Sequence, residues 1–289
     1  MMPGTSNLHL LLCPPQLLLE HKVMVLIDQS LLESRFYLRK TKYISARFEK
    51  SPNITNQCTV SDYLLISYAD QDVSILPLIQ ESFLRAYTYT KDWFGYRGHM
   101  AFDLWMAPKV IDLQYMTCLP CDEGFFCAPG NRGERKIILF VSPLSSQKNA
   151  DKSSLTGCLA HEIAHHIIQD ISCATILTMK RKEDFDLPMW LEEGLCQLIQ
   201  SEVHPSLQRY FTEDIDGKVT WCPLEDLWND LYSCEDVRAA YLQAYRDTKA
   251  LVAARGKSGV IHLLHLNRTH DVNWNDVSRS GNNGESNLA

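Results

Sequence analysis

A predicted apolar helix with two histidines on it constrains the fold of this chain more than any other feature. Four hydrophobic residues recur at four-residue spacing and predict a buried helix: Leu155, Leu159, Ile163 and Ile167. Asp151 or Ser153 is a suitable N-cap for this helix. His161 and His165 are four residues apart, so their imidazoles share one face. Because unpaired polar side chains are costly to bury, this face needs partners, and a metal ion is one that fits.

The spacing of the two histidines is typical of a zinc site on a helix. Both imidazoles can reach one tetrahedral Zn²⁺ ion, and Glu162 lies directly beside them. A carboxylate in that place can take a proton from zinc-bound water as the water attacks a carbonyl carbon. We therefore expect one Zn²⁺ ion held in part by His161 and His165, with Glu162 as the general base.

A third protein ligand has to come from another segment. The extended zincin motif would place a glycine at residue 168 and a histidine at residue 171, but both residues are isoleucine. The acidic pair Glu192 and Glu193 lies on the next predicted helix, and one carboxylate from it would complete a His₂Glu site with one position open for water. The spacing alone does not decide between the two glutamates, although Gly194 would let the two helices approach closely.

Two motifs resemble those of the gluzincin metallopeptidases, most closely their peptidase-MA-like branch. The first is His161-Glu-Ile-Ala-His165 and the second is Trp190-Leu-Glu-Glu-Gly194. The resemblance implies that Glu193, just before the glycine, binds zinc, and we expect Glu192 to be an exposed helical carboxylate. Residues 155–162 and 192–197 are also locally similar to plant peptidases that are activated by ubiquitin and carry LIM domains, but no complete LIM pattern is visible.

Three further side chains, Tyr241, Gln197 and His166, also have expected roles. Tyr241 matches a tyrosine that would assist catalysis at the oxyanion, with packing in the helix core as the alternative. Some gluzincins orient a histidine with an aspartate at the position of Gln197, so the glutamine here would be a weaker hydrogen-bond partner. His166 is expected to point away from the metal and either to pack in the core or to contact substrate.

The predicted elements change character near residue 150. Before it, the patterns predict three strands and one helix: 63–68, 100–106, 136–141 and the helix 73–94, which Gly95 would close. After it, the patterns predict only helices: the histidine helix, a second that starts at 187–188, and a third over 234–255 with Gly256 as its stop.

These elements predict an α+β fold class. By its resemblance the chain would follow a thermolysin-like zincin plan, with an N-terminal α/β lobe that holds a small sheet, a C-terminal helical lobe, and a zinc cleft between them. The expected divisions are an N-terminal extension without clear structure, the α/β lobe, the zinc-binding helical lobe and a disordered polar tail: 1–60, 61–150, 151–275 and 276–289. The resemblance also implies that 137–141 is an edge strand along which substrate lies, with an ordinary sheet strand as the alternative.

The charge and hydropathy of the chain argue against a nucleic-acid partner and against a transmembrane segment. The formal net charge is −7, and nucleic-acid binding depends on basic residues that neutralise phosphates, so we expect no nucleic-acid partner. No apolar run approaches the roughly 18 residues that a transmembrane helix needs, so we expect no transmembrane segment. The sequence does not indicate an oligomeric state.

The ten cysteines leave the compartment open, with a cytoplasmic location favoured and secretion as the alternative. Cys158 and Cys196 lie among apolar helical residues and are expected to be buried thiols. Cys118, Cys121 and Cys127 form a cluster that could bind a second metal or form a disulfide, but no fourth ligand is evident.

The sequence therefore predicts a zinc-dependent metallopeptidase that hydrolyses a peptide or protein substrate. Two alternatives share the zinc site. The first is a catalytically silent, zinc-stabilised module that binds a peptide or protein, which the intact Glu162 disfavours. The second is a zinc hydrolase of a non-peptide amide, which uses the same metal chemistry.

Overall fold

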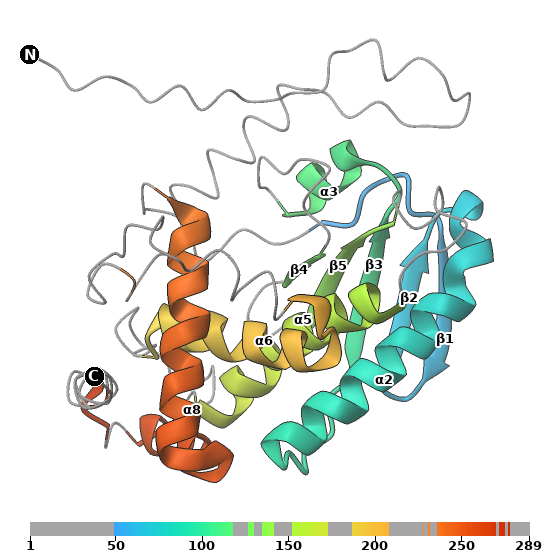
Figure 1. Ribbon diagram of the computed structural model, residues 1–289. Coiled ribbons are helices and arrows are strands. Elements are labelled where there is room, and N and C mark those ends of the chain that lie inside the picture. Colours follow the sequence, from blue (N-terminus) through green and yellow to red (C-terminus); the bar gives the residue numbers. More distant parts are fainter. Residues whose placement is uncertain are drawn as a thin grey trace, which may run out of the picture. The chain divides into compact units, whose positions relative to one another are not determined.

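The computed structural model is an α+β protein that divides into two compact units (Figure 1). It describes residues 49–117, 127–129, 135–141, 152–172, 187–207 and 236–269, with 227, 231, 272–274 and 277. The first unit comprises residues 1–76 and 100–150, and the second comprises 77–99 and 151–289. Among the helices in these ranges, none has the length and apolar character to span a bilayer. The α+β prediction is confirmed.

The first unit contains a mixed five-stranded sheet. Its strands are β1 (Asn56–Ser61), β2 (Leu64–Tyr68), β3 (Phe102–Ala107), β4 (Cys127–Pro129) and β5 (Lys136–Phe140), in the order β1-β2-β3-β5-β4. β2, β3 and β5 are parallel, whereas β1 and β4 are antiparallel additions at the two ends. The central strands β3 and β5 are almost entirely buried, which explains why their sequences are continuous apolar runs.

The predicted edge strand at 137–141 is paired on both sides, so this interpretation was wrong. β5 pairs with β3 along Lys136 to Phe140, and its Ile137 to Leu139 pair with β4 on the other side. β4 is the last strand at this end of the sheet. It was missed because it has only three residues, ends in a proline and carries no alternating pattern.

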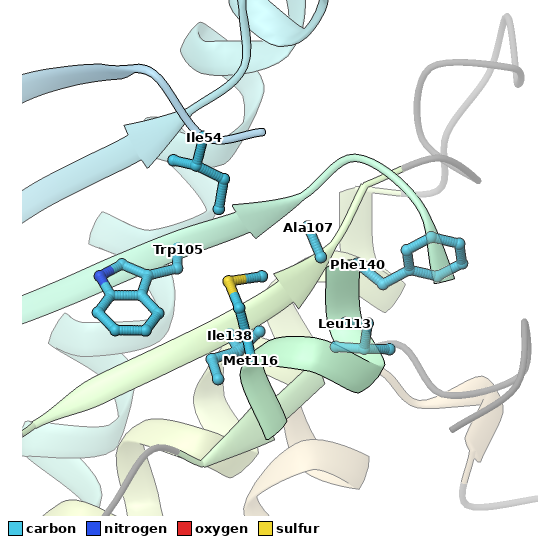
Figure 2. Packing of buried hydrophobic residues seen from close by; sticks show 7 residues of the cluster. All are labelled: Ile54, Trp105, Ala107, Leu113, Met116, Ile138 and Phe140. Carbon is cyan, nitrogen blue, oxygen red and sulfur yellow. The ribbon is translucent and has the colours of Figure 1, made fainter. Parts of the chain in front are cut away.

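One hydrophobic cluster of the first unit packs α3 (Val110–Thr117) against β3 and β5 (Figure 2). Its members are nearly inaccessible to solvent and come from both strands, the helix and the segment before β1: Ile54, Trp105, Ala107, Leu113, Met116, Ile138 and Phe140. Full burial of one such side chain contributes about 1.5–3 kcal/mol for the larger residues. The helix α3 was not predicted because it is short and hydrophobic on most of its surface, without amphipathic periodicity.

Two buried carboxylates lie in this unit, Asp72 in the 3₁₀ helix η2 (Asp70–Ile75) and Asp112 in α3. Asp112 accepts hydrogen bonds from Ser51 Oγ at 2.5 Å and Asn53 Nδ2 at 2.8 Å. Burial, followed by the nearby charge of Asp112, raises the pKa of Asp72 to about 6. Burial also raises the pKa of Asp112.

This raised pKa predicts that Asp72 destabilises the fold at neutral pH. The folded state binds the Asp72 proton more tightly than the unfolded state, so the free energy of unfolding should fall as pH rises from about 4 to about 6 and then level off. Asp72→Asn should remove part of this fall. The urea midpoint of the variant should therefore drop less between pH 4 and pH 7 than the midpoint of the wild type does. Asp70→Asn, at an exposed position of the same turn, is the control. Equal pH dependence in Asp72→Asn and the wild type would contradict the prediction.

The second unit is helical and contains α2 (Leu76–Phe94), α5 (Lys152–Ser172), α6 (Met189–Val203) and α8 (Val237–Asn267). The predicted bounds of α2, α5 and α6 are close to those observed, and Gly95 ends α2 in a left-handed conformation with φ of 60°. Gly256 interrupts α8 at φ of 71° and ψ of 161°, a conformation that favours glycine, but a further helical segment follows it. Asp236 caps α8 by accepting a hydrogen bond from Ala239 N.

The helix α2 belongs with the C-terminal helices, whereas the sequence analysis placed it in the α/β lobe. The carboxylate of Glu202, at the end of α6, links α2 to the C-terminal helices. Its Oε2 accepts hydrogen bonds from Tyr89 Oη at 2.5 Å and Trp93 Nε1 at 3.1 Å, both on α2. The same oxygen lies 3.1 Å from Lys257 Nζ of α8, so three helices meet at one carboxylate.

Candidate metal centre

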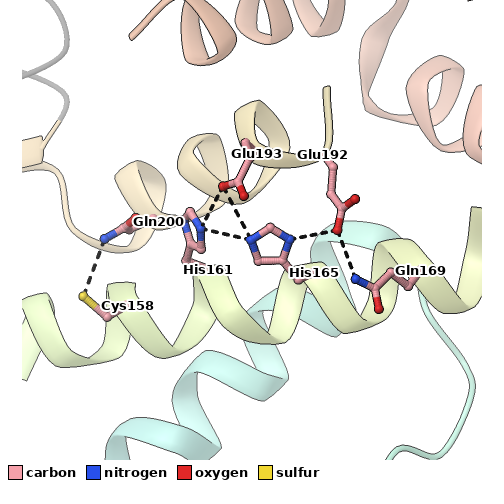
Figure 3. Close-up of polar contacts among 7 residues, drawn as sticks. All are labelled: Cys158, His161, His165, Gln169, Glu192, Glu193 and Gln200. Atoms are coloured by element: carbon pink, nitrogen blue, oxygen red, sulfur yellow. Dashed lines mark hydrogen bonds and ion pairs between the residues drawn. The ribbon is translucent and has the colours of Figure 1, made fainter. Parts of the chain in front are cut away.

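Two imidazoles on α5 face each other at the centre of the candidate site (Figure 3). Nε2 of His161 lies 3.2 Å from Nε2 of His165, and their ring centroids are 5.0 Å apart. Zinc–nitrogen bonds of about 2.0–2.1 Å place two tetrahedral nitrogen ligands about 3.3 Å apart. The separation of the two nitrogens therefore matches that of two ligands on one ion.

Glu193 on α6 points at the same place from the neighbouring helix. Its Oε2 lies 3.5 Å from His161 Nε2 and 3.6 Å from His165 Nε2 (Figure 3). The three atoms form a nearly equilateral triangle, with edges close to those expected around a tetrahedral ion. The structure thus brings together the three residues that the sequence analysis selected as ligands.

Glu192 is buried, so the expectation of an exposed helical carboxylate was wrong. Its Oε1 accepts a hydrogen bond from His165 Nδ1 at 2.9 Å and another from Gln169 Nε2 at 3.1 Å. With its Nδ1 proton held there, His165 presents Nε2 to the centre of the site. A carboxylate behind a histidine ligand is a common arrangement that fixes the ring and increases its basicity.

Gln200 performs the corresponding role for the other imidazole. His161 Nδ1 donates to Gln200 Oε1 at 3.0 Å, and Gln200 Nε2 in turn donates to Cys158 Sγ at 3.6 Å. Gln197, the residue expected in such a role, has a buried Oε1 with no hydrogen-bond partner among the residues described. Gln200 is seven residues after Glu193, two helical turns along the same face, and this spacing could have identified it.

Cys196 is a further donor at the site. His161, His165 and Cys196 form a group that could hold a metal ion, with their ligand atoms all within 4.8 Å of one another. The prediction of a buried thiol is confirmed for Cys196, which is inaccessible to solvent, whereas Cys158 is only partly buried. Burial raises the pKa of this thiol to about 12. The sequence analysis did not identify Cys196 as a donor, although it follows Glu193 by three residues on the same helical face.

The electrostatics of the site favour a cation at its centre. Burial would raise the pKa of Glu193, but His165 and His161 outweigh it and hold this pKa well below its usual range. Burial would lower the pKa of His165, but Cys196 and the carboxylates Glu193 and Glu192 hold it well above its usual value. Positive charge among buried carboxylates is therefore strongly stabilised here, and the donor set fits a divalent ion.

Glu162 lies close enough to His161, His165 and Glu193 to interact with their charges. It is 5% exposed, and its Oε2 has no hydrogen-bond partner within the described part of the chain. Burial, opposed by His161 and His165, raises its pKa. An unpaired carboxylate oxygen is costly to bury, so its presence here indicates a missing polar partner such as water or substrate.

Close packing at Gly194 sets the position of α6 against α8. A Cβ atom at this residue would overlap the carbonyl oxygen of Ala244 and Oγ1 of Thr248, both on α8. No larger residue fits unless the helices separate. Because Gly194 directly follows Glu193, this contact also determines where that carboxylate lies.

We expect Gly194→Ala to destabilise the fold by about 1–3 kcal/mol, because it overpacks a helix contact that includes main-chain atoms. Metal affinity should fall as well, since Glu193 moves with α6. Urea unfolding and zinc competition with a chromophoric chelator measure the two effects. Gly259→Ala is the control, because its Cβ would approach only a side-chain atom of Arg255 and alanine favours helix. Wild-type stability in Gly194→Ala would disprove the packing argument.

Three other predictions concern residues outside this donor group. Tyr241 is half-buried on α8, and its role at the oxyanion stays a prediction. His166 is 4% exposed, in agreement with packing in the helical core. Cys118 and Cys121 lie outside the described residues, as do the side chain of Cys127 and most of the predicted tail, so the second metal site is untested.

Comparison with known proteins adds no further identification. No protein-family model and no curated protein matches the chain. Two short motifs therefore carry the resemblance to gluzincins.

Proposed function

We propose that the chain is a zinc-dependent peptidase of the gluzincin type. The observation that carries the proposal is the triangle formed by His161 Nε2, His165 Nε2 and Glu193 Oε2, with edges of 3.2, 3.5 and 3.6 Å. Two imidazoles and one carboxylate are the ligands of catalytic zinc in several hydrolases. Glu162 Oε2, which has no hydrogen-bond partner among the described residues, supports catalysis rather than a purely structural ion.

In this proposal each side chain has a separate task. A bound zinc ion would polarise the scissile carbonyl and make an attacking water more acidic. Glu162 accepts a proton from that water and later delivers it to the leaving amine. Glu192 and Gln200 hold the two imidazoles through Nδ1, so that both Nε2 atoms are directed inward.

The raised pKa of Glu162 agrees with this role. A general acid–base group works best when its pKa lies near the working pH, and burial moves Glu162 in that direction. Tyr241 is our proposed second catalytic residue, which would donate to the oxyanion. The thermolysin-like plan is part of the same proposal.

The proposal is tested by metal analysis of the purified chain together with cleavage of a mixed peptide library, read by mass spectrometry. We expect one zinc ion at this site and new peptide termini that disappear after chelation. Cleavage of small amides without any peptide cleavage would redirect the assignment to a non-peptide amide hydrolase. A chain that binds no zinc would refute the proposal.

A further inference from the structure

The candidate site holds one protein donor more than a catalytic zinc ion needs. His161, His165 and Glu193 already supply three ligands, and Cys196 places a sulfur atom within 4.8 Å of the imidazole nitrogens. We infer that Cys196 is a fourth ligand of the same ion, and that the thiolate-bound centre is a resting state without hydrolytic activity. The inference rests on the zinc site of the proposed function and extends it.

The helix geometry supports a shared ion. Glu193 and Cys196 are three residues apart on α6, so their side chains project from the same face. In a tetrahedral site the zinc–sulfur bond is about 2.3 Å, which places sulfur about 3.5 Å from each nitrogen ligand. The 4.8 Å limit for the atoms of His161, His165 and Cys196 is about 1.3 Å longer, so the side chains would have to draw together around a bound ion.

The chemistry of the metal-binding side chains also supports Cys196 as a fourth ligand. Zinc accepts nitrogen, oxygen and sulfur ligands, and a thiolate is among its strongest partners in proteins. Two neutral imidazoles with one carboxylate leave a net charge of +1 on a bound divalent ion, whereas a thiolate brings the centre to neutrality.

A four-ligand centre has a direct functional consequence. Structural zinc sites are closed by four protein ligands, whereas catalytic sites keep one position for water or substrate. A Cys196 thiolate on the ion would fill the position that water otherwise takes, and Glu162 would then have no zinc-bound water to deprotonate. Hydrolysis would require that water replaces the sulfur, which leaves with its electron pair, so this side chain would regulate how much of the protein is active.

X-ray absorption at the zinc edge tests the inference, since zinc–sulfur bonds of about 2.3 Å are resolved from zinc–nitrogen and zinc–oxygen bonds of about 2.0–2.1 Å. We expect the wild-type protein to show sulfur scattering that falls by one sulfur per zinc in Cys196→Ser. This variant is nearly isosteric, and Cys196→Ala repeats the test without a hydroxyl group. Cys158→Ser is the matched control, because Cys158 accepts from Gln200 but is not in the donor group.

Activity measurements test the resting state. Peptide cleavage by Cys196→Ala should rise several-fold at saturating zinc, because the fourth position is then open to water. Unchanged sulfur scattering in Cys196→Ser, or a wild-type zinc shell made only of nitrogen and oxygen, overturns the inference and leaves the proposed peptidase intact. A loss of sulfur without a rise in cleavage overturns the resting state. A failure to bind zinc at all refutes the proposed function itself.

Discussion

Replacing Glu162 with glutamine is expected to lower kcat for peptide cleavage by about 10²- to 10⁴-fold, the usual contribution of a general base. The amide cannot accept a proton from the attacking water. It has almost the same volume as the carboxyl group, so the buried position should still be filled and the helix should remain intact. Because Glu162 is not one of the proposed ligands, the zinc content should stay at the wild-type value.

The control for this variant is Asp170→Asn, which makes the same chemical change on the same helix. Asp170 is exposed and accepts a hydrogen bond from Tyr96 at 2.6 Å, away from the donors. It should cleave peptides at close to the wild-type rate. Full cleavage by Glu162→Gln with zinc bound would show that another group activates the water.

Replacing Glu193 with alanine is expected to abolish zinc binding at micromolar concentrations and to lower the melting temperature by several degrees. A ligand present at 100 times its Kd stabilises a folded protein by about 2.7 kcal/mol, and this contribution is lost when the ion is not bound. The variant also leaves two imidazoles without their carboxylate. Chelation should therefore lower the melting temperature of the wild type but leave that of Glu193→Ala almost unchanged, as scanning calorimetry can measure.

Glu192→Gln is the matched comparison on the adjacent residue. Glu192 binds the outer nitrogen of His165, so its loss should weaken zinc binding by about 10- to 100-fold without abolishing it. The assignment depends on this order of effects. If the Glu192 variant lost zinc and the Glu193 variant kept it, Glu192 would be the ligand and Glu193 the residue that supports a ligand.

The helices of the second unit were predictable because their signals are local. Apolar residues at three- and four-residue spacing fixed the positions of α5 and α6, and Gly95 and Gly256 lie where the helical backbone is interrupted. The same periodicity placed His161 and His165 on one face. These inferences need only the geometry of a single helix.

The remainder of the site depends on how two helices pack, which one helix cannot reveal. A glutamate in the first turn of a helix is usually exposed. Glu192, in the first turn of α6, is buried because it faces His165 and Gln169 of α5. Gln200 and Cys196 become partners of the imidazoles for the same reason. In the first unit, β4 forms a strand because it pairs with β5, and its own residues carry no pattern that predicts a strand.

The contact between Gly194 and α8 means that metal affinity can be altered from a helix that contributes none of the donors. A bulkier or a smaller side chain at residue 248 would shift α6 against α8, and Glu193 would move with α6 relative to the imidazoles. Selection or engineering could therefore tune how firmly the ion is retained while every donor stays the same. Substitutions of this kind would go unnoticed in a survey restricted to the motif residues.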